Sequence, residues 1–250
     1  MRNLLQLLTI VACMVVIPTL AQAESIITHS GQTDPTTEGW SESIAYNSTT
    51  PGTVSGTGVD DGGTDAWRVE TDHAWLRYIR DLDQAELDDM NSNGWEASIT
   101  MRLATTGYTP YFDSNFEVAT DNWVTSLLFG TDASGNPQLS ILDSWTAFSG
   151  APIALPALDP GYHTYKLTSA GDVSTVSLYV DDSFVTDLTA LPVHYGGWEK
   201  RILWGDTERG TVVLDAYYAD VAVSSVPEPS TLTLLLASVG MALMACRRYR

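Results

Sequence analysis

Apolar and polar residues alternate along much of the chain with the period of a β-strand. In the segment 95–103, Trp95, Ile99 and Met101 fall on one side of an extended strand, and charged or hydroxyl-bearing residues fall between them. This period of two predicts a strand with one buried face. Further strands, separated by turn residues, are predicted at 66–69, 124–130, 137–143, 162–167, 201–205 and 211–223, and a two-stranded hairpin is predicted at 174–188 with its turn at 181–183. Short strands at this spacing favour an all-β fold, an antiparallel jelly-roll β-sandwich.

One segment departs from the strand pattern and predicts a short helix. Asp83 followed by Glu86 has the spacing of a capping box, and Leu82 and Leu87 have the spacing of a hydrophobic staple. We expect a helix from about Gln84 to Met90, ended by Gly94 or by an asparagine just before it.

The first 23 residues have the features of a secretory signal peptide. Arg2 precedes an apolar stretch, and small residues at Ala21 and Ala23 suit a processing site. Cleavage after Ala23 would remove this apolar signal helix and leave an exported domain, predicted as a single unit at 24–225. Both cysteines, Cys13 and Cys246, lie outside that domain, so no disulfide is expected within it.

The last 25 residues, 226–250, have a different composition. A membrane span is predicted at 231–246, since this stretch is almost entirely apolar, and Arg247 and Arg248 follow it directly. Basic residues favour the cytoplasmic side of a membrane, which would place the folded domain outside. A plain single-span anchor is therefore one interpretation of this end of the chain.

The residues before the predicted span support a more specific interpretation. Pro227 and Pro229 bracket Glu228, and each proline biases its predecessor toward extended backbone. This tripeptide, the single apolar span and the terminal arginines resemble the PEP-CTERM sorting signal of bacterial surface proteins. The resemblance implies recognition and cleavage by an exosortase-type enzyme of a Gram-negative bacterium. It also implies delivery to the cell surface, the outer membrane or an extracellular polysaccharide matrix.

The order of the predicted elements resembles a second family. The stretch G-Y-H-T-Y-K-L, followed by S-L-Y-V-D-D, is similar to a pair of strands in concanavalin A-like jelly rolls of the laminin-G-like branch. The resemblance extends from Trp67 to Val223, with Asp182 where glycine is usual. It implies a domain that could be either a glycoside hydrolase or a non-catalytic binding module, because this fold carries both.

Composition and motifs narrow the functional classes. A net charge of −19 argues against nucleic acid as a partner. We find no E-x-D-x-x-E pair of catalytic carboxylates and no G-x-S-x-G serine motif, so no catalytic residue is predicted. His163 alternates with Tyr165 and Leu167, which favours a hydrogen-bonded histidine of the sheet over a metal ligand.

One loop has the composition of a weak calcium site. Asp60, Asp61 and Asp65 lie in a glycine-rich stretch, and calcium prefers carboxylate and carbonyl oxygens. The alternative is a solvated turn, because such acidic loops are common without metal. Ca²⁺ is the one cofactor that the sequence suggests.

Aromatic residues in loop-like contexts are the candidate ligand contacts. Sugar binding requires exposed aromatic rings with polar groups around them, whereas Trp67 and Trp95 lie in strand patterns typical of a core. The candidates are Trp145, Trp198, Tyr108 and Tyr111. The sequence thus predicts an exported, non-catalytic module that binds glycan. Two alternatives stay open: a glycoside hydrolase acting on polysaccharide, and a structural matrix protein without a ligand.

Overall fold

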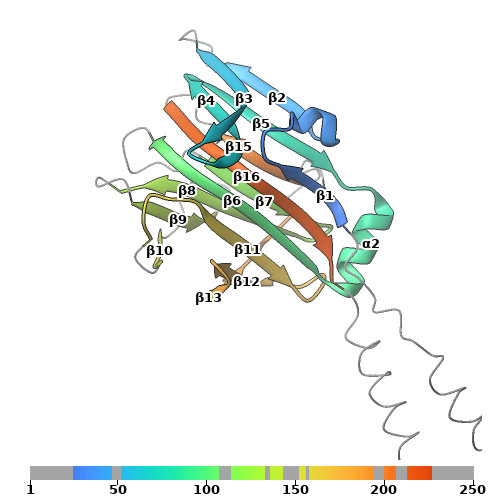
Figure 1. Cartoon of the computed structure of the whole chain (residues 1–250). Helices are drawn as coiled ribbons and strands as arrows, with labels where there is room; N and C mark the ends of the chain where they lie inside the picture. The colour runs from blue at the N-terminus through green and yellow to red at the C-terminus, as the bar shows by residue number, and fades with distance from the viewer. Residues whose placement is uncertain are drawn as a thin grey trace, which may run out of the picture. The chain divides into compact units, whose positions relative to one another are not determined.

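The structure is a computed structural model, which describes residues 25–46, 52–106, 114–132, 136–142, 152–155, 158–193, 200–206 and 213–226. Residues 25–225 form one compact unit made almost entirely of strands (Figure 1). All core residues lie within this unit. It therefore has its own hydrophobic core, as expected of a domain that folds alone.

The first of two antiparallel sheets, sheet A, contains both the first and the last strand of the unit. Strand β16 is its long central member and pairs with β6 on one side and with β4 and then β1 on the other. The order across the sheet is β13 (Ser183–Thr189), β12 (Thr175–Val180), β11 (His163–Ser169), β6 (Trp95–Thr106), β16 (Val213–Ser225), β4 (Thr64–Asp72) and β3 (Thr53–Asp61), with β1 (Ser25–Ser30) beside β16.

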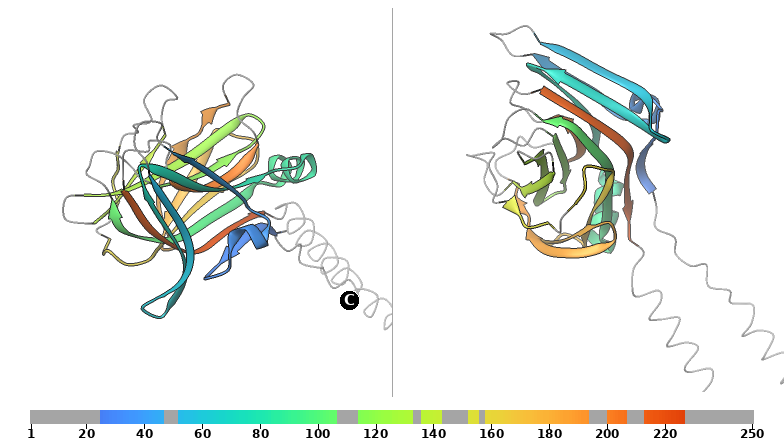
Figure 2. Two further views of the ribbon diagram at one scale, coloured as in Figure 1. Left: turned by 90° about the horizontal axis from the view of Figure 1, so that it is seen from above. Right: turned by 60° about the vertical axis from the view of Figure 1, so that its left-hand side comes forward.

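The second sheet, sheet B, packs against sheet A to form the sandwich (Figure 2). Its order is β10 (Pro152–Ile153), β9 (Pro137–Ile141), β8 (Trp123–Thr131), β7 (Ser114–Ala119), β15 (Arg201–Asp206), β5 (Ala74–Asp81) and β2 (Ser41–Tyr46), with β14 (Leu191–Pro192) paired to β8. A 3₁₀ turn, η1 (Pro35–Glu38), precedes β2. The predicted all-β antiparallel sandwich with one short helix is confirmed.

Helix α2 (Gln84–Asn93) starts as the sequence predicted. The Glu86 N–H donates to Asp83 Oδ1 at 2.9 Å, and the Asp83 N–H donates to Glu86 Oε2 at 2.7 Å. Leu87 and Met90 are buried in the core. The helix extends past the predicted end at Met90 and stops at Gly94, whose φ of +87° suits glycine. A Cβ at this position would lie 2.5 Å from the Ser169 carbonyl oxygen.

The hairpin between β12 and β13 turns on two aspartates in the left-handed region. Asp181 and Asp182 have φ of +48° and +60°, which are the backbone angles of a two-residue type I′ turn. Glycine is usual in such turns, but the Asp181 carboxylate is held by the Thr164 N–H at 3.0 Å and by His163 Nδ1 at 2.7 Å. His163 is thus the hydrogen-bonded histidine of the sheet that the sequence predicted.

The core between the sheets is centred on Trp204, which is completely buried. Its ring centroid lies 4.6 Å from Tyr78, 4.8 Å from Tyr218, 5.0 Å from His29 and 5.8 Å from Trp40. These rings come from both sheets and from the end of η1, so one side chain joins both layers of the sandwich. Trp67 and Trp95 are also buried, as predicted.

Segments 1–23 and 231–246, the predicted signal and membrane helices, lie outside the described residues. Within the part of the chain that the structure describes, no helix is both long and apolar enough to cross a membrane.

Candidate binding face

Sheet B buries polar side chains on the face opposite the core. Its inward face supplies apolar residues such as Tyr78, Phe116 and Trp204 to the core. Successive residues of a strand point to opposite faces, so their neighbours in sequence lie on the outer face. We define the polar face of sheet B by its polar members Arg77, Asn115, Glu117, Ser126, Ser140 and Arg201, of which all but Arg201 are less than 9% exposed.

The strand registers place all of these residues except Arg201 in two adjacent rows across β5, β15, β7, β8 and β9. The first row contains Arg77, Gly205, Asn115, Leu128 and Ser140. The second row contains Ile79, Leu203, Glu117 and Ser126. The polar groups of the two rows therefore come from four strands of one hydrogen-bonded sheet, β5, β7, β8 and β9. The buried side chains of Leu128 and Leu203 lie between them.

Gly205 leaves the first row without a side chain between Arg77 and Asn115. Its φ is +124°, and a Cβ built there would lie 2.5 Å from the Leu76 carbonyl oxygen. Only glycine fits this backbone without strain. No side chain therefore separates Arg77 from Asn115 in this row.

The electrostatics of this face differ from those of the whole chain. Arg201 Nε donates to Glu117 Oε1 at 3.1 Å, and the Glu117 side chain is only 4% exposed. The Arg77 guanidinium lies 5.7 Å from the centre of the Trp75 ring. The two rows and Arg201 contain two guanidinium groups and one carboxylate, and Asp81 lies opposite Arg201 on the same face. These charges balance, in a chain of net charge −19.

Asn115 adds an unsatisfied acceptor to the same face. Its side chain is 8% exposed, and no donor among the described residues reaches its Oδ1 atom. A buried polar atom normally has a hydrogen-bond partner, because leaving it without one costs about 1–3 kcal/mol. A hydroxyl group of a bound molecule would supply the missing donor.

The chemistry available on this face suits binding. Arginine and asparagine donate to hydroxyl and carboxylate oxygens, and asparagine and serine also accept from hydroxyl groups. Hydrolysis of a glycosidic bond requires two carboxyl groups, about 5–5.5 Å apart in retaining enzymes and about 6.5–9.5 Å apart in inverting ones. Glu117 is the one carboxylate in the two rows described above, and it already binds Arg201.

The three carboxylates of the predicted calcium loop point to separate partners. The loop is the tip of the β3–β4 hairpin, where Asp60 accepts from the Gly63 N–H at 2.7 Å. Asp65 accepts from Gln32 Nε2 at 2.7 Å, and Asp61 accepts from Arg102 Nε at 2.8 Å. Among the described residues, no group of three or more His, Cys, Asp or Glu side chains is arranged to hold a metal. These contacts give the loop a structural role, and calcium binding there stays a prediction.

The four predicted aromatic contacts, Tyr108, Tyr111, Trp145 and Trp198, lie outside the described residues. The described residues that flank them belong to different ends of the sandwich. Tyr108 and Tyr111 lie between Thr106, the last residue of β6, and Ser114, the first residue of β7, which pairs with Asp206 of β15. Arg201, which follows Trp198, pairs with Ala119 at the opposite end of β7.

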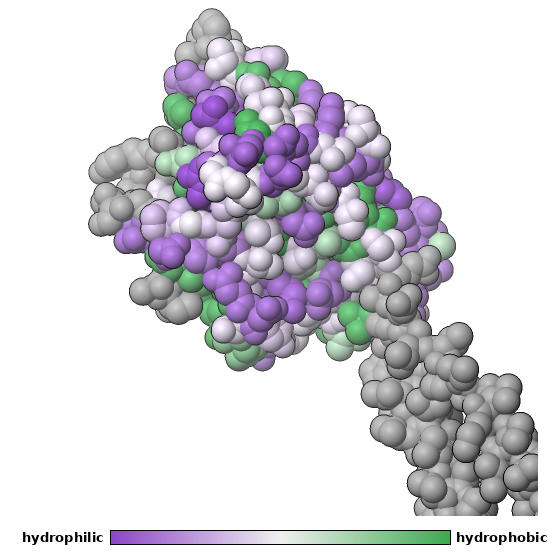
Figure 3. All heavy atoms as spheres, viewed as in Figure 1, coloured by the Kyte–Doolittle hydropathy of each residue, from purple (hydrophilic) through white to green (hydrophobic). Residues whose placement is uncertain are grey.

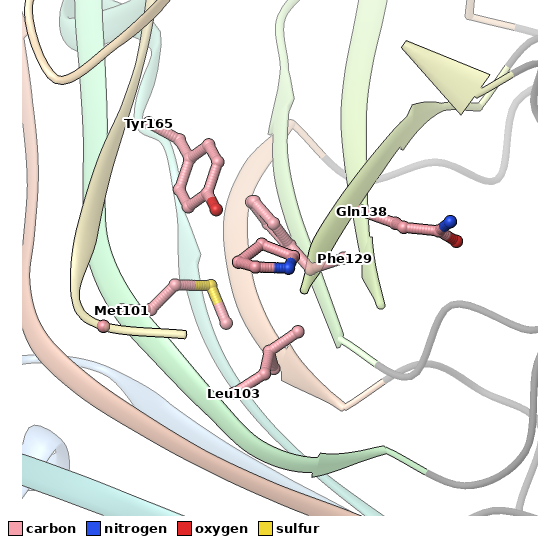
Figure 4. Close-up of a pocket in the computed structure, with 7 residues that line it drawn as sticks. Met101, Leu103, Phe129, Gln138 and Tyr165 are labelled. Atoms are coloured by element: carbon pink, nitrogen blue, oxygen red, sulfur yellow. The ribbon is translucent and has the colours of Figure 1, made fainter. Parts of the chain in front are cut away.

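A small cavity opens between the two sheets, but it is too small for a sugar. Its volume is about 10 Å³, which accommodates about one water molecule. Figure 4 shows Met101, Leu103, Phe129 and Tyr165 around it, with Gln138 pointing away. The cavity is therefore a packing feature of the core.

Sequence reasoning missed the polar face of sheet B, although a signal was present. In S-N-F-E-V-A, Asn115 and Glu117 alternate with Phe116 and Val118, which predicts a strand with one polar face. Such a pattern does not distinguish a solvated polar face from a buried one. The burial of Asn115 and Glu117 follows from tertiary structure alone.

Comparisons with known proteins show what the C-terminal segment and the fold of the domain resemble. Residues 225–250 match the family model of the PEP-CTERM protein-sorting motif. This match confirms the predicted sorting signal, and it indicates an exported protein sorted to the surface or extracellular space. Pro227, Glu228, Pro229, Arg247 and Arg248 lie within the matched segment, and their individual roles stay predictions. No curated protein matches the chain.

Solved structures resemble the domain at low sequence identity. A carbohydrate esterase from the Shiga toxin-encoding bacteriophage phi24B has a TM-score of 0.61 at 14% identity, over 82% of this chain and 100% of that one. The binding domain of botulinum neurotoxin DC has a TM-score of 0.48 at 8% identity, over 86% of this chain. This chain spans about half of the toxin domain, 51% of its length. At these identities the similarity to the esterase shows the fold alone.

Proposed function

We propose that residues 24–225 form a non-catalytic module that binds glycan, exported through an N-terminal signal and sorted by the PEP-CTERM motif. The module acts at the cell surface or in the extracellular matrix. The observation that carries this proposal is the polar face of sheet B, where side chains with hydrogen-bonding capacity are buried on the side of the sheet that faces away from the core.

Several features of this face support glycan as the ligand. A sugar presents hydroxyl groups that both donate and accept hydrogen bonds, which matches Asn115, Ser126 and Ser140. The Arg201–Glu117 pair fixes two charged groups in position, so binding does not require them to be ordered first. Export into a polysaccharide-containing environment, which the sorting signal implies, brings such a ligand to the protein.

The proposal is tested by co-sedimentation of residues 24–225 with insoluble and gelled polysaccharides, in calcium and in EDTA. We expect retention on at least one polymer. Replacing Asn115 by Leu, which keeps about the size of the side chain but removes its Oδ1 acceptor and its two donors, should weaken retention about tenfold, the equivalent of about 1.4 kcal/mol. The control is Thr57→Ala, an exposed position on β3, and circular dichroism verifies that each variant is folded.

The possible outcomes separate the competing functions. Failure of every polymer to retain the domain would overturn the proposal in favour of a structural matrix protein. Release of soluble sugars from a polymer would favour the hydrolase. Loss of retention in EDTA would favour the calcium loop of Asp60, Asp61 and Asp65, whereas unchanged retention would show that calcium is not required.

A further inference from the structure

A row of three side chains crosses the outer face of sheet A near its edge. Lys166 pairs with Tyr179, and Tyr179 pairs with Phe184, so the three lie side by side on β11, β12 and β13. The Tyr179 and Phe184 ring centroids are 5.7 Å apart with an interplanar angle of 72°, and Lys166 Nζ lies 5.4 Å from the Tyr179 centroid. We call this row the aromatic strip.

Phe184 is the exposed member of the aromatic strip, whereas Tyr179 and Lys166 are half-buried. Phe184 is 57% exposed, among the highest values for a large apolar side chain in the part of the chain that the structure describes. In Figure 3, hydrophobic residues lie among hydrophilic ones at the lower rim of the domain, where Figure 1 labels β12 and β13. An exposed phenylalanine that packs on a half-buried tyrosine among polar residues is characteristic of a recognition surface rather than of a core.

The strip is held in place by the hairpin that carries it. The Asp181–Asp182 turn lies between Tyr179 and Phe184, and the Asp181 carboxylate is anchored by His163 and by the Thr164 N–H. The pairing register also shifts between Leu178 and Tyr179, and such bulges re-aim side chains. The two rings are thus presented on a fixed backbone, which lowers the entropy lost on binding.

Polar side chains flank the strip on both sides. The next row toward α2 contains Glu96, Thr168, Ser177 and Asp187, and Ser177 Oγ donates to Asp187 Oδ1 at 2.7 Å. On the other side, the hydroxyl groups of Thr100 and Thr164 are 2.8 Å apart. A pyranose ring has a matching arrangement, with C–H groups on its face and hydroxyl groups around its rim.

From this arrangement we propose that the aromatic strip is a second glycan site, which stacks on the face of a neutral hexopyranose unit. The charges around the strip favour a neutral sugar over an acidic one. Lys166 already faces two carboxylates, Asp182 at 3.4 Å and Glu96 at 3.9 Å, and Asp187 adds a third acid nearby. With a net charge of −19 on the chain, a polymer of uronic acids would be repelled.

This site is independent of the polar face of sheet B, because its residues belong to the outer face of the other sheet. A chain with two such sites on opposite layers could bind two polymer strands at once and cross-link a matrix. Each site alone could then be weak, since linked sites reinforce one another.

Affinity electrophoresis of residues 24–225 tests the proposal, in native gels cast with barley β-glucan as the neutral polymer or with alginate as the acidic one. We expect retardation in β-glucan and not in alginate. Phe184→Ala should reduce the retardation about tenfold, because it removes the exposed ring on which the sugar stacks. Tyr179→Ala should also reduce it, because the Tyr179 ring packs against Phe184 at an interplanar angle of 72° and holds it in place. The matched control is Tyr46→Ala on β2, an aromatic side chain that is also 57% exposed.

Two results would overturn this site: equal mobility of Phe184→Ala and the parent in β-glucan, or stronger retardation of the parent in alginate. Asn115→Leu, which leaves the net charge unchanged and is run in the same gels, separates this proposal from the previous one. If the strip acts alone on β-glucan, Asn115→Leu is retarded as much as the parent, relative to a polymer-free gel, and Phe184→Ala is not.

Discussion

Truncation of Trp204 is the most informative perturbation of the fold. Its indole is completely buried and lies within 6 Å, between ring centroids, of four other aromatic or imidazole rings. Trp204→Ala would leave a cavity at the centre of the sandwich. Tryptophan-to-alanine changes in cores cost about 3–5 kcal/mol. For a domain of about 200 residues, each kcal/mol lowers Tm by about 2–4 °C, so we expect a loss of about 6–20 °C.

A second variant separates the packing of the ring from hydrogen bonding. The Trp204 Nε1–H has no acceptor among the described residues. Trp204→Phe therefore keeps an aromatic ring at the junction of the two sheets and loses no hydrogen bond. We expect this variant to lose about 1–2 kcal/mol, clearly less than Trp204→Ala.

Thermal unfolding of residues 24–225, followed by circular dichroism, measures both variants against Phe184→Ala. Phe184 is 57% exposed, so its truncation should change stability by about 0.5 kcal/mol or less. The reasoning fails if Trp204→Ala lowers Tm by less than about 3 °C, or if Trp204→Phe is as destabilising as Trp204→Ala.

Three further predictions concern local features. Asp83→Ala removes the N-cap of α2 and should cost about 1 kcal/mol in urea unfolding, whereas an unchanged midpoint would contradict the capping role. Gly205→Ala forces a Cβ against the Leu76 carbonyl oxygen and should destabilise the domain by about 1–3 kcal/mol, measured in the same way. Burial lowers the pKa of His163, but its contacts with Asp181 and the Asp159 carbonyl outweigh this effect and raise the pKa overall. The stabilisation that protonated His163 contributes is therefore complete below a pH of about 6.5, and it is lost as the pH rises through the pKa of His163 in the folded domain. The stability difference between the parent and His163→Gln should shrink over that range, and a constant difference would refute this.

Local sequence signals predicted much of this architecture. The capping box of Asp83 and Glu86 involves residues three apart, so its geometry follows from the sequence directly. The alternation in β6 identified Trp95, Ile99 and Met101 as core residues, and all three are buried. Period-two patterns and caps are decided by neighbouring residues, which is why one sequence suffices to identify them.

The roles of charged residues were harder to predict, because distant partners decide them. Asp61 resembled a calcium ligand within its loop, but its partner Arg102 lies 41 residues away on β6. No local pattern around Glu117 indicates its partner Arg201, which lies 84 residues further along the chain. Sheet order determines such contacts, and sequence periodicity does not encode sheet order.

Hydrogen–deuterium exchange of residues 24–225, with and without the polysaccharide that retains the domain, locates the binding face. We expect added protection in β7, β8 and β15, in the peptides that contain Asn115, Ser126 and Leu203. Protection confined to α2 or to the β3–β4 hairpin, with exchange in β7 and β15 unchanged, would contradict the assignment of the polar face of sheet B as the glycan-binding face.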